Sequence, residues 1–196
     1  MWRKGEYEPL TIDQMAELLV SLKQEVPQYV RIKRVMRDIS EKGVVAGPKT
    51  TNLRQLVSKK MAEKGIACKC IRCREVGMSK VGKIRLFRIE YNASGGKEIF
   101  LSFESSSLLV AFLRLRIDDK TAKVRELHVY GQVVPIKAMT KGYQHKGYGK
   151  RLLEKAEKTA KAFGCKKIRV TSGVGVRDYY RKLGYELEGY YMCKGL

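Results

Sequence analysis

The sequence predicts an α/β (α+β) fold, in which a mixed and mostly antiparallel sheet is flanked by helices and preceded by a small helix-and-strand segment. Residues 83–134 contain four strand-like segments in succession, joined by turns. Helix-like and strand-like segments alternate from residue 149 to residue 193, and a Gly-rich stretch at residues 143–150 joins the two parts. Strands in succession followed by alternating helices and strands favour a single sheet with helices packed on its faces.

The N-terminal segment is too small and too polar to bury a good core by itself. Apolar residues at helical spacing predict a helix over residues 12–22, with Thr11 or Asp13 as its N-cap. Residues 29–35 alternate apolar and basic side chains, which predicts a short strand with a basic face. A second helix is predicted over about residues 52–64. We therefore expect residues 1–66 to be the end of a larger domain.

The remaining elements are bounded by turn residues. Residues 84–91 alternate in polarity, residues 92–96 favour a turn, and residues 98–105 form the return strand of a hairpin. Two further strands are predicted over residues 106–116 and 122–134. Later elements are a helix over 149–163, a strand over 167–171, a short helix over 176–183 and a last strand over 185–193. The long helix is predicted to bury Leu152, Leu153, Ala156 and Ala160.

The Gly-rich stretch has the chemistry of a phosphate-binding loop. Gly147 and Gly149 allow a tight turn and a close approach of backbone to a ligand. The helix that follows presents unpaired N–H groups and a positive dipole end, and neighbouring basic side chains add charge. Lys150 is followed by Arg151 rather than Ser or Thr, and a third glycine is missing, so neither the Walker nor the dinucleotide pattern is met. A Gly-rich strand–helix turn without a ligand is the alternative.

Three cysteines within six residues, Cys68, Cys70 and Cys73, predict a metal site. Three thiolates at this spacing can converge on one tetrahedral ion, and soft thiolates select zinc or an iron–sulfur centre. The spacing differs from the Cys-x-x-x-Cys-x-x-Cys of most radical-SAM clusters, which favours zinc. Candidates for a fourth ligand are His128, His145, Cys165 and Cys193. Free thiols in a loop are the alternative.

The net charge of +21 is unevenly distributed along the chain. Residues 31–90 carry 17 basic and 5 acidic side chains, and residues 141–169 carry 10 basic and 2 acidic ones. A surface this basic attracts polyanions, nucleic acid above all, although a lysine-rich thermophilic surface is an alternative. No apolar run approaches the roughly 20 residues of a membrane span, and no signal-type segment follows Met1. We expect a cytoplasmic protein with no membrane association.

Several longer strings resemble the C-terminal acetyltransferase domain of the Elongator catalytic subunit, a member of the GCN5-related acetyltransferases. The strings cover most of the chain and include the Gln-x-x-Gly-x-Gly motif at residues 144–149. They are Asn52–Leu56, Cys70–Gly77, Arg125–Gly131, Gln144–Gly149 and Ser172–Tyr185.

The resemblance implies a tRNA wobble-uridine carboxymethyl synthase, which combines a radical-SAM domain with an acetyltransferase domain. It implies that residues 1–66 end the radical-SAM domain, that residues 67–80 form a Cys-rich zinc-binding linker, and that residues 81–196 bind acetyl-CoA. In the family, S-adenosylmethionine and an iron–sulfur cluster bind to the part of the radical-SAM domain that carries its cysteine motif. This chain lacks that motif. Partners implied are tRNA, other Elongator-like subunits or a second copy. This chain should therefore retain acetyl-CoA binding and some tRNA surface, without the full reaction.

Site residues follow from the resemblance and from chemistry together. Backbone groups at a bulge in the fourth strand would hold the pantetheine arm, and amides of the Gly-rich loop would hold the pyrophosphate. The residues for these two roles are Glu126, Leu127, His128, Val129, Tyr143, Gln144, His145, Lys146, Gly147, Tyr148, Gly149 and Lys150. Tyr180 or Tyr179 would reach the thioester and protonate the leaving thiolate, and we expect only one of them to face the ligand.

Glu126 and His128 are candidate bases for activating water or an amine. We expect them on opposite faces of the strand, so that only one faces the site unless a bulge intervenes. A plain, buried and hydrogen-bonded histidine is the alternative for His128. A lysine acetyltransferase acting on protein is the alternative function, although a basic surface disfavours a lysine-rich tail, and a pure RNA-binding module is a third. Predicted RNA contacts are Arg31, Lys33, Arg34, Arg37, Arg54, Lys59, Lys60, Arg72 and Arg74.

Overall fold

The computed structural model spans the 196 residues and describes all of them except 37–39, 51, 78, 80 and 132–146. The chain divides into two compact units, Met1–Arg74 and Glu75–Leu196. The division falls within the linker expected at residues 67–80. None of the helices in the described ranges has the length and apolar character needed to cross a membrane.

The N-terminal unit is built on two helices, α1 (Ile12–Glu25) and α2 (Leu53–Glu63). Thr11 caps α1: its hydroxyl accepts from the Gln14 amide at 3.2 Å, and the Gln14 side chain accepts from the Thr11 amide at 2.8 Å. Short helices are η1 (Trp2–Lys4), η2 (Glu41–Gly43) and α3 (Ile71–Arg74). The helices bury a small apolar cluster of Ala16, Val20, Leu53, Val57 and Met61.

The strand predicted over residues 29–35 is wrong, because no described strand lies beside it to complete a ladder. Its backbone carbonyls have other partners. The carbonyl of Val30 accepts from the Ile71 amide at 2.9 Å, and that of Ile32 accepts from the Arg54 guanidinium at 3.2 Å. The alternation of apolar and basic side chains therefore marks an extended segment that is held by a helix start and an arginine.

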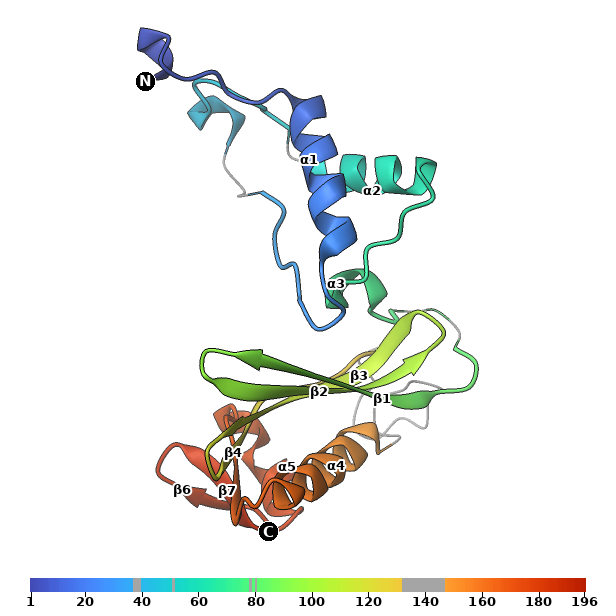
Figure 1. The fold of residues 1–196 in the computed structure, drawn as a ribbon, viewed down its shortest axis with the longest axis vertical. Helices are drawn as coiled ribbons and strands as arrows, with labels where there is room; N and C mark the ends of the chain where they lie inside the picture. Colours follow the sequence, from blue (N-terminus) through green and yellow to red (C-terminus); the bar gives the residue numbers. More distant parts are fainter. Residues whose placement is uncertain (37–39, 51, 78, 80, 132–146) are drawn as a thin grey trace. The chain divides into compact units, whose positions relative to one another are not determined.

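The C-terminal unit contains a seven-stranded sheet in the order β1-β2-β3-β4-β5-β7-β6 (Figure 1). The pairing of β4 with β5 is parallel, and the other pairs of neighbouring strands are antiparallel. This confirms the predicted mixed, mostly antiparallel sheet. The strands are β1 (Arg85–Ala93), β2 (Gly96–Ser105), β3 (Leu108–Asp118), β4 (Thr121–Val129), β5 (Lys167–Val170), β6 (Glu186–Glu188) and β7 (Tyr191–Gly195).

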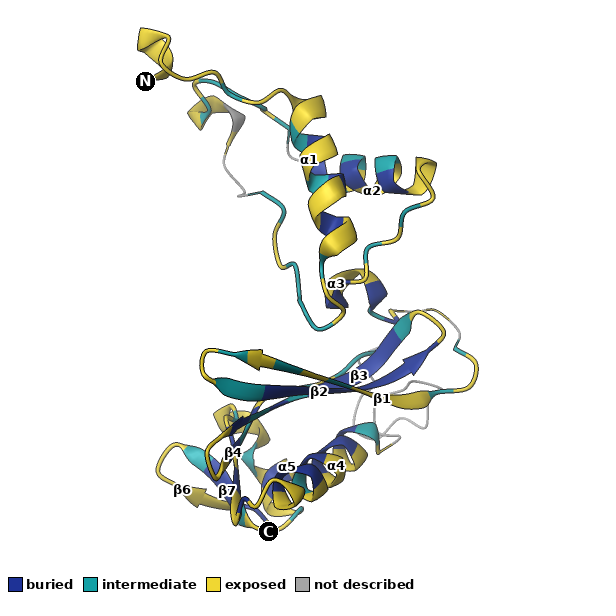
Figure 2. Ribbon diagram, in the orientation of Figure 1, coloured by how far each residue is buried: buried dark blue, intermediate teal, exposed yellow. Residues whose placement is uncertain are grey.

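Helix α4 (Tyr148–Ala162) packs against one face of this sheet. Its apolar side buries Leu152, Leu153, Ala156 and Ala160, as the sequence predicted (Figure 2). The same cluster takes alternate residues of the central strands, among them Leu101, Leu113 and Leu115. Complete burial of these side chains makes this face the main hydrophobic core of the unit.

The last strand expected over residues 185–193 is wrong in one respect, because the chain folds back on itself within it. Gly189 adopts a φ of 58°, which suits glycine, and β6 pairs with β7 across this turn. Preceding the pair are η3 (Val174–Val176) and α5 (Arg177–Arg181), which replace the single short helix predicted over 176–183. Residues 132–134 of the strand predicted over 122–134 lie outside the described residues.

Strand β4 carries an extra residue and then separates from its neighbour. Arg114 pairs with Glu126 and Leu115 with Val124, so that Arg125 is the unpaired residue of a bulge. Between β4 and β5 the pairing extends only over Ala122–Val124 among the described residues. Past that point the only described strand beside β4 is β3.

Candidate active site

A hollow of about 560 Å³ lies at the N-terminal end of α4. Three elements supply its walls: the end of β4, the first turn of α4, and the segment from η3 to α5. The lining residues are Leu127, Val129, Gly147, Tyr148, Gly149, Lys150, Val176, Tyr179 and Tyr180. We call this the α4 hollow.

Glycine is required at the mouth of the α4 hollow for two different reasons. Gly147 is the N-cap of α4 with a φ of 79°, a left-handed conformation that glycine adopts without strain. A Cβ on Gly149 would lie 2.9 Å from the Tyr179 hydroxyl and 3.6 Å from a methyl of Val129. Gly147 has no side chain to cap the helix, so the first-turn amides of α4 remain available to a ligand.

Both tyrosines of α5 line the hollow, and the expectation that only one of them faces the ligand stays a prediction. Tyr179 is 40% exposed and Tyr180 is 6% exposed, and their rings meet edge to face at 5.2 Å. The hollow is broad enough to be bordered by two successive positions of a short helix. Burial raises the pKa of Tyr180 to about 12, and it also raises the pKa of Tyr179.

A polar network behind Tyr180 fixes the position of its ring. Tyr185 is fully buried and packs edge-on against Tyr180 at 5.8 Å. The Tyr185 hydroxyl donates to Glu157 at 2.8 Å, and the Lys194 ammonium donates to the same carboxylate at 3.1 Å. Burial, followed by the bond to Glu157, raises the pKa of Tyr185. The phenol of Tyr180 is therefore held on a rigid support.

The side chains of Glu126 and His128 do not line the α4 hollow. The prediction that they face opposite ways is wrong, because residues two apart in a strand point to the same face. His128 Nε2 lies 3.8 Å from Glu126 Oε1, and Glu126 accepts from Arg114 at 2.9 Å. Leu127 and Val129 point to the α4 side in their place. Any role of Glu126 or His128 as a base stays a prediction. Such a base would act on the face of the sheet opposite the α4 hollow.

The predicted loop residues divide into two groups. Gly147, Tyr148, Gly149 and Lys150 border the α4 hollow. The other predicted loop residues lie outside the described part of the chain: Tyr143, Gln144, His145 and Lys146. Val176 was not predicted from the sequence, and it follows only from the way η3 leads into α5.

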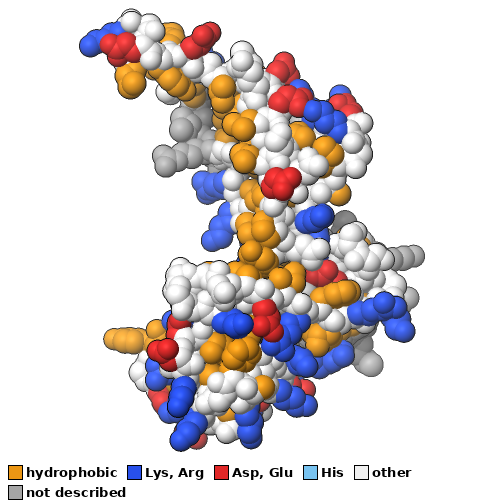
Figure 3. All heavy atoms as spheres, in the orientation of Figure 1, with side chains coloured by type: hydrophobic (Ala, Val, Ile, Leu, Met, Phe, Trp, Pro, Cys, Tyr) orange, Lys and Arg blue, Asp and Glu red, His pale blue; other side chains and the backbone are white. Residues whose placement is uncertain are grey.

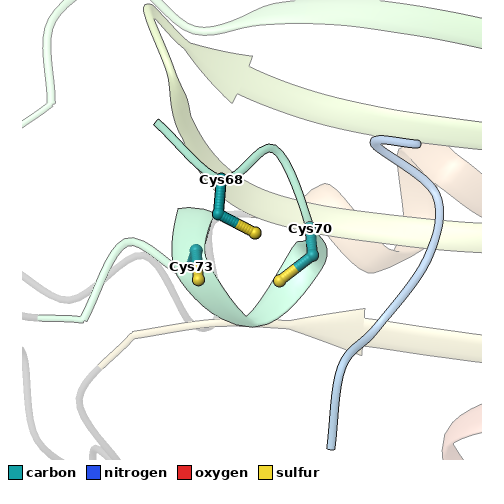
Figure 4. Close-up of side chains that lie close together, drawn as sticks. All are labelled: Cys68, Cys70 and Cys73. Carbon is teal, nitrogen blue, oxygen red and sulfur yellow. The ribbon is translucent and has the colours of Figure 1, made fainter. Parts of the chain in front are cut away.

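The thiol cluster of Cys68, Cys70 and Cys73 lies in the turn before α3 and on α3 itself (Figure 4). The three sulfur atoms lie within 4.8 Å of one another. A hydrogen bond from Cys73 lowers the pKa of Cys70 to about 4, and burial opposes it. The same bond, followed by burial, raises the pKa of Cys73. Three convergent thiols fit a tetrahedral zinc ion that has one further ligand.

Two of the fourth-ligand candidates, Cys165 and Cys193, are buried within the C-terminal unit itself, which disfavours them as ligands. His128 stacks on Phe112, and its role as a fourth ligand stays a prediction. His145 lies outside the described residues. Sequence reasoning missed Lys23, a buried lysine whose Nζ lies 3.7 Å from Cys73 Sγ. The sequence feature that could have identified Lys23 is its position on the apolar side of α1, three residues after Val20.

The predicted RNA contacts have mixed surroundings. Arg74 is only 6% exposed and donates to the carbonyls of Lys69 and Gln28, so its prediction as a surface contact is wrong. Lys60 forms ion pairs with Asp13 at 3.1 Å and Glu17 at 3.0 Å. Lys59 lies 3.9 Å from Glu63. Arg31 is half-buried, Arg72 is exposed, and Arg37 lies outside the described residues.

Three of these cations lie together. Lys33, Arg34 and Arg54 border a second hollow of about 370 Å³, which we call the basic hollow. The other lining residues are Val35, Met36, Leu53 and Gln55. On the face visible in Figure 3, Lys and Arg side chains are also spread over the C-terminal unit.

Comparisons with known proteins agree with this architecture. Residues 1–63 match the Radical_SAM C-terminal domain, and residues 60–185 match the acetyltransferase (GNAT) family. A "tRNA uridine(34) acetyltransferase" of Methanocaldococcus jannaschii is 50% identical over 100% of this chain and 40% of its own length. "Elongator complex protein 3" of Schizosaccharomyces pombe is 44% identical over 100% of this chain and 40% of its own length.

A solved structure is similar over the entire chain. It is that of archaeal Methanocaldococcus infernus Elp3 with an N-terminal deletion, with a TM-score of 0.90 and 46% identity. The match covers 100% of this chain and 51% of that one. The chain thus spans about half, or less, of the length of the relatives that it matches.

Proposed function

Because the chain belongs to the acetyltransferase (GNAT) family, we propose that its C-terminal unit binds acetyl-CoA in the α4 hollow as part of a tRNA uridine-modifying enzyme. The observation that carries the proposal is the hollow itself. It combines a glycine-capped helix start, an exposed strand end and two tyrosines in one place. The names of the relatives favour tRNA as the nucleic acid.

The α4 hollow offers each part of acetyl-CoA a suitable group. The first-turn amides of α4 and the Lys150 ammonium would bind the pyrophosphate, since a helix N-terminus and a cation both attract anions. The backbone of residues 126–129 lies where β4 has left β5, and the groups on this edge, which pair with no strand in the described part of the chain, would accept and donate along the pantetheine arm. Leu127 and Val129 supply apolar contacts beneath it.

Tyr180 is the group that we assign to proton transfer. Its raised pKa keeps the phenol protonated at neutral pH, so it can donate to a thiolate leaving the acetyl group. The ring is held by Tyr185, whose own hydroxyl is committed to Glu157. Tyr179 closes the hollow beside the start of α4. Its hydroxyl lies 2.9 Å from the position that a Cβ on Gly149 would take.

The basic hollow is our candidate for contact with tRNA phosphates. Lys33, Arg34 and Arg54 bring three cations to one concave surface of the N-terminal unit. Phosphate contacts of this kind release counterions, so each adds about 0.7–0.9 to the slope of log affinity against log salt. A triple change of these residues to Glu should weaken tRNA binding and flatten that slope in anisotropy titrations at two salt concentrations. An unchanged slope would contradict this assignment.

Zinc is the ion that we propose for the thiol cluster. Cys68, Cys70 and Cys73 would hold it and fix the turn before α3, with the charge of Lys23 offsetting that of the thiolates. Elemental analysis of protein purified without added metal checks this. Folded protein that contains no zinc, or iron in its place, would contradict the proposal.

Titration calorimetry tests acetyl-CoA binding directly. Gly149→Glu should abolish it, because the new side chain meets Tyr179 and places a negative charge beside the pyrophosphate. Gly195→Glu is the matched control, since it adds the same charge at an exposed strand position with no atom near its Cβ. Equal acetyl-CoA affinity in both variants would contradict the site. If acetyl-CoA is consumed faster with a lysine peptide than with tRNA, the result would favour the protein acetyltransferase alternative.

A further inference from the structure

An aromatic ladder crosses the face of the sheet opposite α4. Phe100 of β2, Phe112 of β3 and His128 of β4 stand side by side, with ring centroids 5.4 Å and 5.7 Å apart and planes tilted by 28° and 21°. Tyr130 continues the layer, 5.6 Å from His128 and nearly parallel to it at 13°. The two phenylalanines are fully buried, whereas the His128 side chain is 49% exposed. The ladder thus ends in two rings that are partly open to solvent, His128 and Tyr130.

The ladder ends where the sheet itself divides. His128 lies beyond the last residue of β4 that pairs with β5, so in the described part of the chain no neighbouring strand supplies the next ring. Planar groups stack on such rings, and unpaired nucleobases do so with little regard to sequence. The position of His128 therefore suits a flat ligand that continues the ladder.

Polar groups border the open ring on the same face. Arg114 lies over the rings of Phe100 and Phe112, at 5.5 Å and 5.6 Å, and it orients the Glu126 carboxylate at 2.9 Å. The second oxygen of Glu126 lies 3.8 Å from His128 Nε2. A carboxylate only accepts hydrogen bonds, so it would recognise an N–H on the edge of a stacked base.

Cations lie farther along the same face. Lys123 and Arg169 are register partners on β4 and β5, and their side chains are on the face opposite the core residues Val124 and Val170. They are roughly 15 Å from His128 along the strand, a separation that suits phosphates of flanking nucleotides rather than of the stacked one. Base-stacking rings beside phosphate-neutralising cations are the usual components of single-stranded RNA sites.

We propose that His128 and the aromatic ladder take an unpaired nucleobase of the RNA, on the face of β4 opposite the α4 hollow. The proposal rests on the proposed function, since it locates a base-binding site for the same nucleic-acid substrate. It assigns His128 to stacking and Glu126 to the edge of the base.

Fluorescence of a base analogue tests this. The probe is a single-stranded uridine oligonucleotide with one 2-aminopurine, whose emission falls when the base stacks on an aromatic ring. With wild-type protein we expect binding accompanied by quenching. His128→Ala should lower the affinity roughly 5- to 150-fold, the range for loss of one base–aromatic stack, and should remove the quenching. His128→Phe should retain both, because it keeps the ring.

Tyr190→Ala is the matched control, since it removes an exposed ring from the turn between β6 and β7. It should leave affinity and quenching unchanged, and thermal melting of each variant confirms that it is folded. The proposal is overturned if His128→Ala binds and quenches like the wild type, or if His128→Phe behaves like His128→Ala. Absence of any RNA binding by the wild type would overturn both this proposal and the RNA part of the proposed function, whereas acetyl-CoA calorimetry tests the α4 hollow separately.

Discussion

The two faces of the sheet around β4 differ in the chemistry of the side chains that they present to a ligand. On the α4 face, Leu127 and Val129 pack against the core and form an apolar wall. On the other face, Glu126 and His128 are partly exposed and are joined to Arg114 and a row of rings. Because strand side chains alternate, one strand can serve two ligands of different chemistry without either site disturbing the other.

Among the changes that test the difference between the two faces, substitutions in the core should have the largest effect on the free energy of unfolding. Leu113 lies on the α4 face and is fully buried, so Leu113→Ala should lower the free energy of unfolding by about 2–5 kcal/mol. Phe112→Leu, at the adjacent buried position on the ladder face, removes less side-chain volume than Leu113→Ala and should cost less. Urea denaturation measures both. Equal losses would mean that the ladder face is as tightly packed as the α4 face.

Removal of the Tyr180 hydroxyl should act on turnover and on alkaline stability. A general acid contributes about 10²–10⁴-fold to rate, so Tyr180→Phe should lower acetyl-CoA turnover by at least about 100-fold while acetyl-CoA still binds. The folded-state pKa of Tyr180 is raised from 10.0 to about 12. Its contribution to stability is therefore fully present below pH 10 and is lost as pH rises through about 12.

Thermal melting from pH 9 to pH 12 should accordingly show a smaller alkaline loss for Tyr180→Phe than for the wild type. Tyr179→Phe is the comparison, because its ring is more exposed and borders the same hollow. If Tyr179→Phe slows turnover and Tyr180→Phe does not, the assignment of the acid passes to Tyr179.

The smallest expected effect concerns the polar face. Glu126→Gln keeps the shape of the side chain but removes the negative charge that pairs with Arg114, whose side chain is 17% exposed. Because the pair is partly solvated, we expect a loss of no more than about 1 kcal/mol in the free energy of unfolding. A loss above about 3 kcal/mol in urea titrations would show that Arg114 and Glu126 behave as a buried pair.

Periodicity alone was enough to predict most of the C-terminal unit. The alternation in residues 84–105 predicted the β1–β2 hairpin, and the helical spacing of Leu152, Leu153 and Ala156 predicted the buried side of α4. Gly189 was not recognised as a turn, so β6 and β7 were predicted as one strand. A glycine within a strand-like pattern is compatible with either a strand interior or a turn, and only the pairing partner decides.

The site was predictable where it depends on local sequence and not where it depends on pairing. Gly147 and Gly149 were identified because a strand–helix turn needs them. The directions of Glu126 and His128 depend on the rule that residues two apart share a face and on the bulge at Arg125, which is a property of the β3–β4 ladder. Arg74 and Lys60 were predicted as RNA contacts from charge, because sequence does not show that Arg74 is buried or that Lys60 has acidic neighbours.

The bulge at Arg125 sets which side chains of β4 face each surface of the sheet. Arg125 is held there by the buried carboxylate of Glu98, at 2.7 Å, which also binds Arg116. Because of the bulge, Val124 and Leu127 face the same side although they are three residues apart. If Arg125 entered the regular ladder opposite Arg114, every later side chain would turn over, so that Leu127 and Val129 would face outwards and His128 would face the acyl-donor site. Deletion of Arg125 would instead keep the pairs Arg114–Glu126 and Leu113–Leu127, and with them both surfaces.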